Sequence, residues 1–204
     1  GVTVARGVRM ILDAETDTRA IIAEPKVYTP TSGSMRVNLD NGPLLSINQI
    51  RYTKQVEENK TRGAVAGGLD ALDNTSVLLL VAVNQGGTWN GTAYTGGTNY
   101  TVGTEVKITN GQIDWSGAGA EPAPGSAYKC VYQYQTIAGA TITAKDDTGF
   151  TISGPVAGST FTIDYTFALP RIDAIVLDQE GRIARIKGVA TQYNPSDPSV
   201  PDTL

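Results

Sequence analysis

The chain has 204 residues, a formal net charge of −4, no histidine and one cysteine. Without histidine it lacks the commonest general base, the commonest metal ligand, and both the Ser-His and the Cys-His dyads. Its lysines and arginines are scattered, and because a nucleic-acid interface needs a basic stripe, we expect no nucleic-acid binding. The longest apolar run, residues 77–83, is much shorter than the roughly 18 residues of a membrane span, so we expect no membrane insertion.

The distribution of turn-forming residues predicts an all-β protein. The chain contains 23 glycines and 10 prolines, close to one turn signal for each short strand. Between these signals apolar residues alternate with polar ones, a period of two that is typical of strands with one buried face. We therefore expect β-sandwich-like (Ig-like) modules with many hairpins and little or no helix.

In chain order, strands are predicted at residues 35–39, 44–56, 76–84, 100–108, 112–115, 128–134 and 161–167. Pro25 would end a ladder or lie on an edge strand. Residues 56–74 are charged at first and then rich in glycine, so we expect a long loop there. The continuous apolar run of residues 76–84 indicates a strand buried on both faces.

Two aromatic side chains are the candidate ligand contacts. Trp89 and Tyr94 are interleaved with glycine, threonine and asparagine, and an aromatic ring in such a loop need not belong to a core. Asn90-Gly91 between them is a strong hairpin signal. Trp115, next to Asp114, is expected to be a core or edge anchor. Cys130 lies on the aromatic face of its strand and is expected to be a buried small hydrophobe.

Residues 125–134 align without gaps on residues 158–167, which suggests two similar β units that each end with an aromatic strand. Near the C-terminus, residues 172–177 and 182–189 predict a hairpin around Gly181. The predicted organisation is an N-terminal set of strands that pack with this hairpin (1–45), a β-sandwich-like domain (46–136), a second β module (137–193) and a proline-rich linker to a region beyond Leu204 (194–204).

Carboxylates are the remaining catalytic residue type. Asp146-Asp147, Asp70 with Asp73, and Asp178 with Glu180 are the closest groups, and each lies in or beside a predicted turn, where Asp bonds its own backbone. No stretch has the spacing of a calcium-binding loop or of a phosphate-binding loop. We therefore predict no catalytic, metal or cofactor-binding residues and no enzyme activity; a depolymerase that uses Asp146 or Asp178 is the weakest hypothesis.

Several short motifs occur in a fixed order along the chain. They are Thr61-Arg62-Gly63 with Gly67-Gly68 and Asp70, Gln85-Gly-Gly-Thr88, Gly97-Thr-Asn-Tyr100, Gln112-Ile-Asp-Trp-Ser116, Ala120-Glu-Pro-Ala-Pro-Gly-Ser-Ala-Tyr128, Leu169-Pro-Arg-Ile-Asp173 and Leu177-Asp-Gln-Glu-Gly-Arg182. Together they resemble a family of uncharacterised domains in tailed-bacteriophage proteins associated with the tail, the baseplate or the tail fibre. The resemblance covers most of the chain and is weakest over the first forty residues.

This resemblance implies a structural virion protein of the tail baseplate or of tail-fibre attachment, made in the bacterial host cytoplasm. Its partners would be other tail or baseplate subunits and further copies of itself, with a trimer favoured because fibres are usually trimers. The family offers no catalytic residues to carry over. The alternative is a host-attachment module that recognises bacterial surface glycan through Trp89 and Tyr94.

Overall fold

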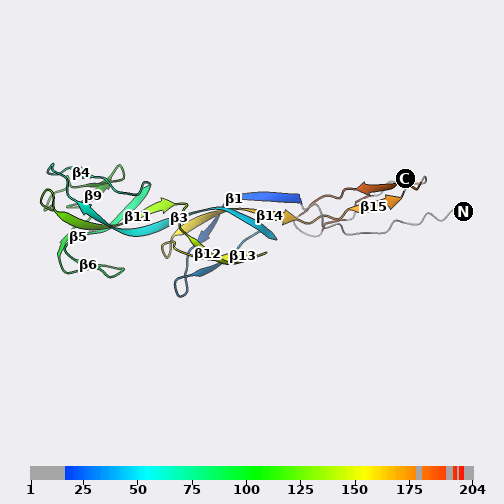
Figure 1. The fold of residues 1–204 in the computed structure, drawn as a ribbon, viewed down its shortest axis with the longest axis horizontal. Helices are drawn as coiled ribbons and strands as arrows, with labels where there is room; N and C mark the ends of the chain where they lie inside the picture. The colour runs from blue at the N-terminus through cyan, green and yellow to red at the C-terminus, as the bar shows by residue number, and fades with distance from the viewer. Residues whose placement is uncertain (1–16, 178–180, 192–194, 197, 200–204) are drawn as a thin grey trace.

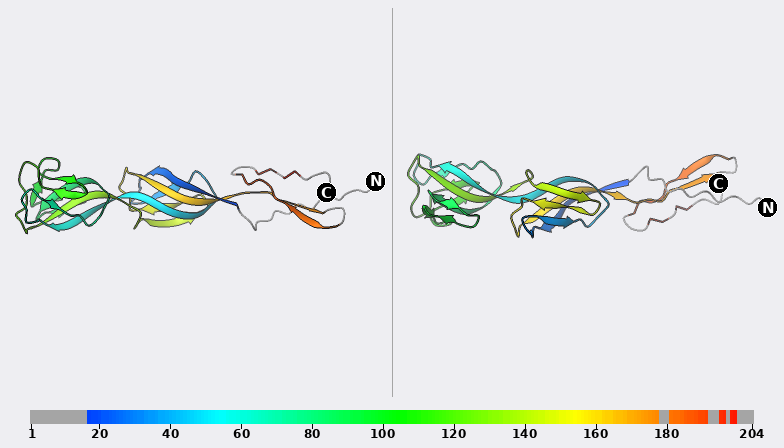
Figure 2. Two further views of the ribbon diagram at one scale, coloured as in Figure 1. Left: turned by 90° about the horizontal axis from the view of Figure 1, so that it is seen from above. Right: turned by 60° about the horizontal axis from the view of Figure 1, so that its bottom comes forward.

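The computed structural model describes residues 17–177, 181–191, 195–196 and 198–199, and every regular element in this part of the chain is a β-strand (Figure 1). The predicted all-β class is therefore confirmed. The strands form two twisted modules that lie end to end, followed by a separate hairpin (Figure 2). We call residues 17–51 with 137–169 the proximal module and residues 52–136 the distal module.

The proximal module packs a small sheet on a larger one. The main sheet has the order β1-β14-β3 and the small sheet the order β12-β13-β2, and all of their pairings are antiparallel. The strands are β1 (Asp17–Val27), β2 (Met35–Asn38), the first part of β3 (Leu44–Thr61), β12 (Thr141–Asp146), β13 (Gly149–Ser153) and β14 (Thr160–Leu169). Alternate residues of β14 face the small sheet and form a core with it: Phe161, Ile163, Tyr165 and Phe167.

The distal module repeats this plan and adds strands to it. Its main sheet has the order β3-β11-β5-β8, and its small sheet the order β4-β10-β9. The strands are β4 (Leu69–Asp70), β5 (Val77–Gln85), β8 (Thr98–Tyr100), β9 (Lys107–Thr109), β10 (Gln112–Asp114) and β11 (Ala127–Thr136). A second core lies between the sheets and contains Trp115 and Cys130, which are 3% and 0% exposed. Of the two predicted positions for Trp115, core or edge, the structure shows the core, and the predicted burial of Cys130 is confirmed.

One strand, β3, belongs to both modules. Its residues 44–51 pair with β14, and its residues 52–61 pair with β11. With 18 residues at roughly 3.3 Å each, β3 is about 60 Å long. The predicted loop at residues 56–74 is therefore wrong in its first part. The charged run continues as a strand because Glu58, which is 8% exposed, lies in the sheet opposite Cys130.

Two further strand predictions need correction. β5 is not buried on both faces, because Leu78 and Leu79 are 58% and 53% exposed near its start. Only the short β8 lies beyond β5, and it pairs with the last three residues of β5. The predicted strand at residues 100–108 is two strands, β8 and β9, separated by a turn in which Thr101 accepts backbone hydrogen bonds from residues 104–106.

The described part of residues 1–45 pairs differently from the expected arrangement. β1 lies beside β14 and β2 lies beside β13, whereas the predicted partner was the C-terminal hairpin. That hairpin exists as β15 (Ala174–Leu177) and β16 (Ile183–Ile186), which pair with each other. β1 is the edge strand of the main sheet, as Pro25 predicts. Most of the predicted linker at 194–204 lies outside the described residues.

Both connections to the rest of the chain leave the proximal module at the same end. Asp17, the first residue of β1, pairs with Leu169, the last residue of β14. We call this end the base, the opposite end of the distal module the apex, and the junction between the modules the waist (Figures 1 and 2). Within the described residues, no helix is long and apolar enough to cross a membrane.

Candidate functional site

The predicted contact residues Trp89 and Tyr94 lie on a small hairpin near the apex. Its strands are β6 (Thr88–Trp89) and β7 (Tyr94–Thr95), and they pair directly with each other. Asn90 organises the turn, because its side-chain oxygen accepts hydrogen bonds from the backbone N–H groups of Thr92 and Ala93, both at 2.9 Å. We call residues 86–97 the apical hairpin.

The apical hairpin lies over the outer face of the distal sheet, on the side opposite β4 and β9 (Figure 1). The Tyr94 hydroxyl donates a hydrogen bond of 3.1 Å to Glu57, which is the cross-strand neighbour of Val131 on this face. Val131 is 0% exposed although it points away from the core between the sheets. The hairpin therefore gives the distal sheet a cover on its second face.

Trp89 and Tyr94 contact each other rather than forming an open platform. Their ring centroids are 5.1 Å apart at an interplanar angle of 60°, an edge-to-face arrangement. Tyr94 is only 8% exposed, and burial, together with the hydrogen bond to Glu57, raises the pKa of its hydroxyl. Trp89 is half-buried, so the residue remains partly accessible to solvent.

The stem of the apical hairpin is fixed by Asn84, a fully buried side chain that the sequence reasoning did not select. Its amide group donates hydrogen bonds to Gly96 O at 3.0 Å and to Asn99 Oδ1 at 2.7 Å, and its oxygen accepts one from Gly87 N at 2.6 Å. Gly97 has φ = +66°, and a Cβ there would lie 2.3 Å from Gln85 O. Two of the motifs that carry the family resemblance, Gln85-Gly-Gly-Thr88 and Gly97-Thr-Asn-Tyr100, thus form this stem.

A buried charged cluster lies beneath the apex, and we call it the apical network: Arg62, Asp70, Trp115, Glu121 and Tyr128. Asp70 Oδ2 accepts hydrogen bonds from Trp115 Nε1 at 2.9 Å and from the Tyr128 hydroxyl at 2.8 Å. Asp70 Oδ1 accepts from Gly63 N at 2.9 Å and from Arg62 at 3.2 Å. The carboxylate therefore has four donors, and burial with the bond to Asp70 raises the pKa of the Tyr128 hydroxyl.

Arg62 connects this cluster to two apical loops. Its guanidinium donates to Glu121 Oε2 at 2.6 and 3.0 Å and to Val65 O at 2.7 Å, and it lies 5.7 Å from the centroid of the Trp115 ring. Glu121 also accepts a hydrogen bond from Gly67 N. The side chain of Arg62 is 1% exposed. A charge so deeply buried is stable only when its donors are paired, and here they hold the loops 63–68 and 118–125 against the core.

The apical network accounts for much of the family resemblance. Arg62, Gly63, Gly67 and Asp70 belong to the first motif, and Trp115, Glu121 and Tyr128 belong to the later ones. These residues lie far apart in the sequence and are brought together by β3, β4 and β11. Their hydrogen bonds are made within the protein, and among the described residues no buried side-chain nitrogen or oxygen is left without a partner. This geometry is that of a cluster that stabilises the fold.

The acidic groups occupy turns or ion pairs. Asp146 accepts hydrogen bonds from Arg36 at 2.6 and 2.8 Å and from Thr148, and these lower the pKa of its carboxyl group. Asp73 pairs with Lys60 at 3.3 Å, and its backbone N–H donates to Glu58. Asp178 and Glu180 lie outside the described residues. In the part of the chain that the structure describes, no group of three or more acidic or cysteine side chains could hold a metal ion.

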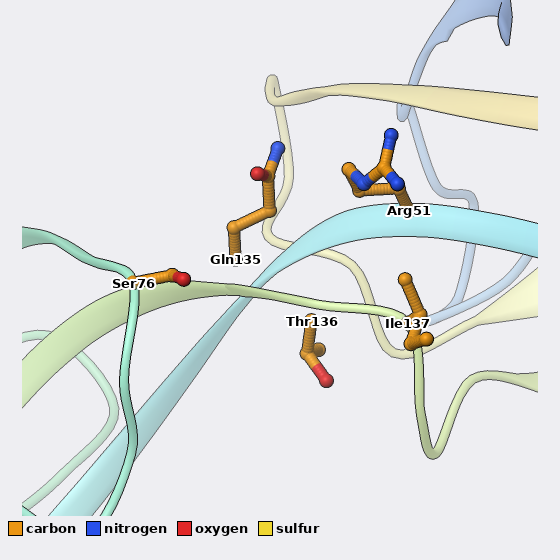
Figure 3. Close-up of a pocket in the computed structure, with 5 residues that line it drawn as sticks. All are labelled: Arg51, Ser76, Gln135, Thr136 and Ile137. Carbon is orange, nitrogen blue, oxygen red and sulfur yellow. The ribbon is translucent and has the colours of Figure 1, made fainter.

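A shallow hollow of about 280 Å³ lies at the waist. Its lining residues are Arg51, Ser76, Gln135, Thr136 and Ile137 (Figure 3). Arg51 and Gln135 point to one side of the crossing strands and Thr136 points to the other, so the polar groups do not converge (Figure 3). This arrangement does not resemble a ligand site, in which a few polar groups point into one cavity.

No curated protein and no solved structure matches this sequence. A family model described as a domain of unknown function, DUF4815, matches residues 1–204. The match spans the whole chain, and the protein therefore belongs to the DUF4815 family.

Proposed function

We propose that this protein is a structural component of a bacteriophage tail, an extended arm in the baseplate or at the attachment of a tail fibre. It acts through contacts with other tail subunits and with further copies of itself, a trimer being the favoured assembly. Its two-layered modules are of the β-sandwich, Ig-like type. The order of motifs that resembles phage tail domains supports the phage assignment.

The observation that carries the proposal of an arm is the course of the chain. The two modules are stacked on one strand of 18 residues, and Asp17 and Leu169 lie side by side at the base. A subunit attached through its base would therefore hold the apex about 60 Å away, the length of β3. Short strands with hydrogen-bonded turns make each of its two modules stiff.

Strand addition at β1 is disfavoured as the route of assembly. β1 is the outermost strand of its sheet, but it contains Pro25 and a bulge between Ile21 and Glu24. Ala23, in the bulge, has φ = 57° and donates its N–H to Asp164 at 2.8 Å. Proline and bulges prevent edge-to-edge pairing, so the contacts between subunits are expected at the module faces and ends.

The test places single labels on the arm in assembled particles. Exposed residues at the two ends, Thr92 near the apex and Thr18 at the base, are each replaced by cysteine in a Cys130→Ala chain and labelled with gold. Electron microscopy of phage tails should show both labels on the tail, with the Thr92→Cys label projecting about 60 Å farther from the attachment point. Particles that assemble fully and infect without the protein would contradict the proposal.

The second candidate, recognition of a bacterial surface glycan, depends on the accessible part of Trp89, because the Tyr94 hydroxyl is occupied by Glu57. It is separated from the structural role by Trp89→Ala. In the structural role, particles with Trp89→Ala keep their adsorption to host cells. Loss of adsorption with normal tail morphology would favour the glycan-binding role.

A further inference from the structure

The two modules share more than a general plan. Six strands of each module follow the same sequence order, and each main sheet places an aromatic strand, β14 or β11, between two antiparallel neighbours. In order, β1, β2, β3, β12, β13 and β14 of the proximal module correspond to β3, β4, β5, β9, β10 and β11 of the distal module. The last part of β3 thus serves as the first strand of the second module.

Each module also contains the same five-residue hydrogen-bond cluster, which we call a clasp. The proximal clasp consists of Glu24, Lys26, Asp40, Asn41 and Tyr165, and the distal clasp of Glu58, Lys60, Asp73, Asn74 and Tyr132. In both, the tyrosine hydroxyl donates to the glutamate and accepts from the asparagine amide, at 3.0 Å in the proximal clasp and 2.8 Å in the distal clasp.

The remaining contacts of the clasps also agree. The lysine pairs with the glutamate at 2.8 Å in the proximal clasp and 2.7 Å in the distal clasp, and it pairs with the aspartate at 2.7 and 3.3 Å. The aspartate N–H donates to the glutamate at 3.1 and 3.2 Å. The sequence carries the same pattern twice, as Glu-x-Lys followed by Leu-Asp-Asn and later by tyrosine. Unrelated modules would not be expected to repeat every contact of a five-residue cluster.

The modules differ at one point in the strand order. Between its third and fourth strands the proximal module contains the whole distal module, residues 52–136, whereas the distal module contains the apical hairpin and β8 there.

The cores of the two modules also differ, at the end of each module that points toward the apex. Tyr28, Val37, Ile152 and Phe161 of the proximal module are replaced at the corresponding positions by Arg62, Asp70, Trp115 and Tyr128.

We propose that the distal module is a second copy of the proximal module, inserted between its third and fourth strands, and that the two copies unfold as separate cooperative units, each held by its own clasp. The apical network and the apical hairpin then cap the free end of the arm, as terminal capping repeats do in repeat proteins. Separate units are expected because each module has its own core and no core residue of one cluster belongs to the other.

The chain contains built-in reporters for one module. Its only cysteine, Cys130, and both of its tryptophans, Trp89 and Trp115, lie in the distal module. Cys130 is 0% exposed, and burial, together with the nearby charge of Glu58, raises the pKa of its thiol to about 12. Thiol labelling therefore requires opening of the distal module, and tryptophan emission reports on that module alone. Circular dichroism reports on both.

The test compares Tyr132→Phe with its counterpart Tyr165→Phe in the full chain. Tyr132→Phe should speed labelling of Cys130 by Ellman's reagent about tenfold and lower the urea midpoint of tryptophan emission, because a buried hydrogen bond to a carboxylate is lost. Tyr165→Phe should change the rate of Cys130 labelling by less than about twofold and leave the urea midpoint of tryptophan emission unchanged. Its circular dichroism transition should separate into two steps, because the proximal module then unfolds at a lower urea concentration than the distal module.

Asn74→Ala and Asn41→Ala form a milder matched pair, since each removes the amide that donates to the tyrosine hydroxyl of its own clasp, Tyr132 or Tyr165. They should reproduce the same separation with smaller effects. If both members of a pair shift both probes equally, the chain unfolds as one unit and the proposal is wrong. If neither member shifts either probe, the clasps do not hold the modules and the proposal is equally wrong.

Discussion

Arg62 and Asp70 form a charged contact at positions that are apolar in the proximal module. A buried ion pair contributes little net stability, but the removal of one member leaves an uncompensated charge. In this protein the carboxylate of Asp70 also accepts hydrogen bonds from Trp115 and Tyr128, so its loss would leave these buried donors unpaired. The apical network should therefore be sensitive to single substitutions and more tolerant of coordinated ones.

Asp70→Val introduces the residue of the corresponding proximal position, Val37, but it removes one of the two carboxylates that pair with buried Arg62 and the acceptor of the Trp115 and Tyr128 hydrogen bonds. We expect it to destabilise the distal module by about 3–5 kcal/mol. Arg62→Tyr/Asp70→Val, which copies both proximal residues, should be more stable than Asp70→Val alone. Urea unfolding followed by tryptophan emission measures both variants, and a double variant that is less stable than the single one would refute this view of the network.

The proximal clasp should make stability depend on alkaline pH. Burial, with the hydrogen bond to Glu24, raises the pKa of Tyr165 from 10.0 to about 12. Burial opposes ionisation of Lys26 as well, but its bonds to Asp40 and Glu24 raise its pKa overall. Both groups hold their protons more tightly in the folded state, so their contribution is complete below pH 10 and is lost as the pH rises through about 12.

Urea unfolding at a series of pH values from 9 to about 12.5 measures this loss when circular dichroism and tryptophan emission are recorded together, because the emission identifies the distal transition and the rest of the circular dichroism change belongs to the proximal module. Tyr165→Phe is the control, because it removes the titrating hydroxyl and should flatten the dependence. A wild-type chain whose stability does not change over this range would contradict the proton assignment.

At the scale of elements, the apical hairpin depends on a glycine that approaches the backbone closely. Gly97 and Gly91 both have positive φ, at +66° and +99°. A Cβ at Gly97 would also lie 2.5 Å from Gly87 N, whereas a Cβ at Gly91 would meet nothing within 4 Å. Gly91 therefore needs to be glycine only for its positive φ, whereas Gly97 needs to be glycine both for its positive φ and because the backbone approaches it closely.

We expect Gly91→Ala to cost roughly 1–2 kcal/mol, the usual cost of a left-handed conformation for a residue with a Cβ. Gly97→Ala should cost clearly more, because backbone atoms of the stem must move. Trp89 belongs to the hairpin, so its emission should shift in Gly97→Ala and remain near that of the wild type in Gly91→Ala. Equal losses in both variants would show that the close contact at Gly97 is relieved without cost.

The elements that could be predicted from the sequence are those with a regular apolar period. Alternation identifies β11 and β14, and Asn90-Gly91 identifies the apical turn. The continuation of β3 through Glu58 and Lys60 could not be predicted in this way, because charged residues normally indicate a loop. The partner of Glu58, Tyr132, lies more than seventy positions later, so only the folded sheet shows that Glu58 is buried.

The same limit applies to the apical network. Arg62, Asp70 and Glu121 belong to motifs that are visible in the sequence, but nothing local indicates that they meet. The repeated Glu-x-Lys and Leu-Asp-Asn patterns were the available signal for the clasps, and they lie in parts of the chain whose strands are otherwise dissimilar. Trp89 and Tyr94 could be located from the sequence, whereas their contact with each other and the bond of Tyr94 to Glu57 could not.

At the scale of the whole molecule, the stacked modules predict an extended particle. A compact protein of this length has a radius of gyration of about 17 Å. Because β3 alone spans about 60 Å, the monomer should give a clearly larger value in small-angle X-ray scattering coupled to size exclusion. A monomer peak with a radius of gyration near 17 Å would mean that the modules fold back on each other in solution.

β3 also determines how the arm would respond to force. A pull between base and apex runs along its covalent backbone across the waist, where residues 51 and 52 are consecutive members of the two sheets. Stretching the waist would require the distortion of bonds and backbone angles, whereas bending requires only small changes in backbone dihedral angles and a few contacts, such as the hydrogen bond from Tyr52 to Ala138 O at 2.7 Å. The arm should therefore resist stretching along its length but bend at the waist. It would transmit a pull between base and apex and bend under a sideways force.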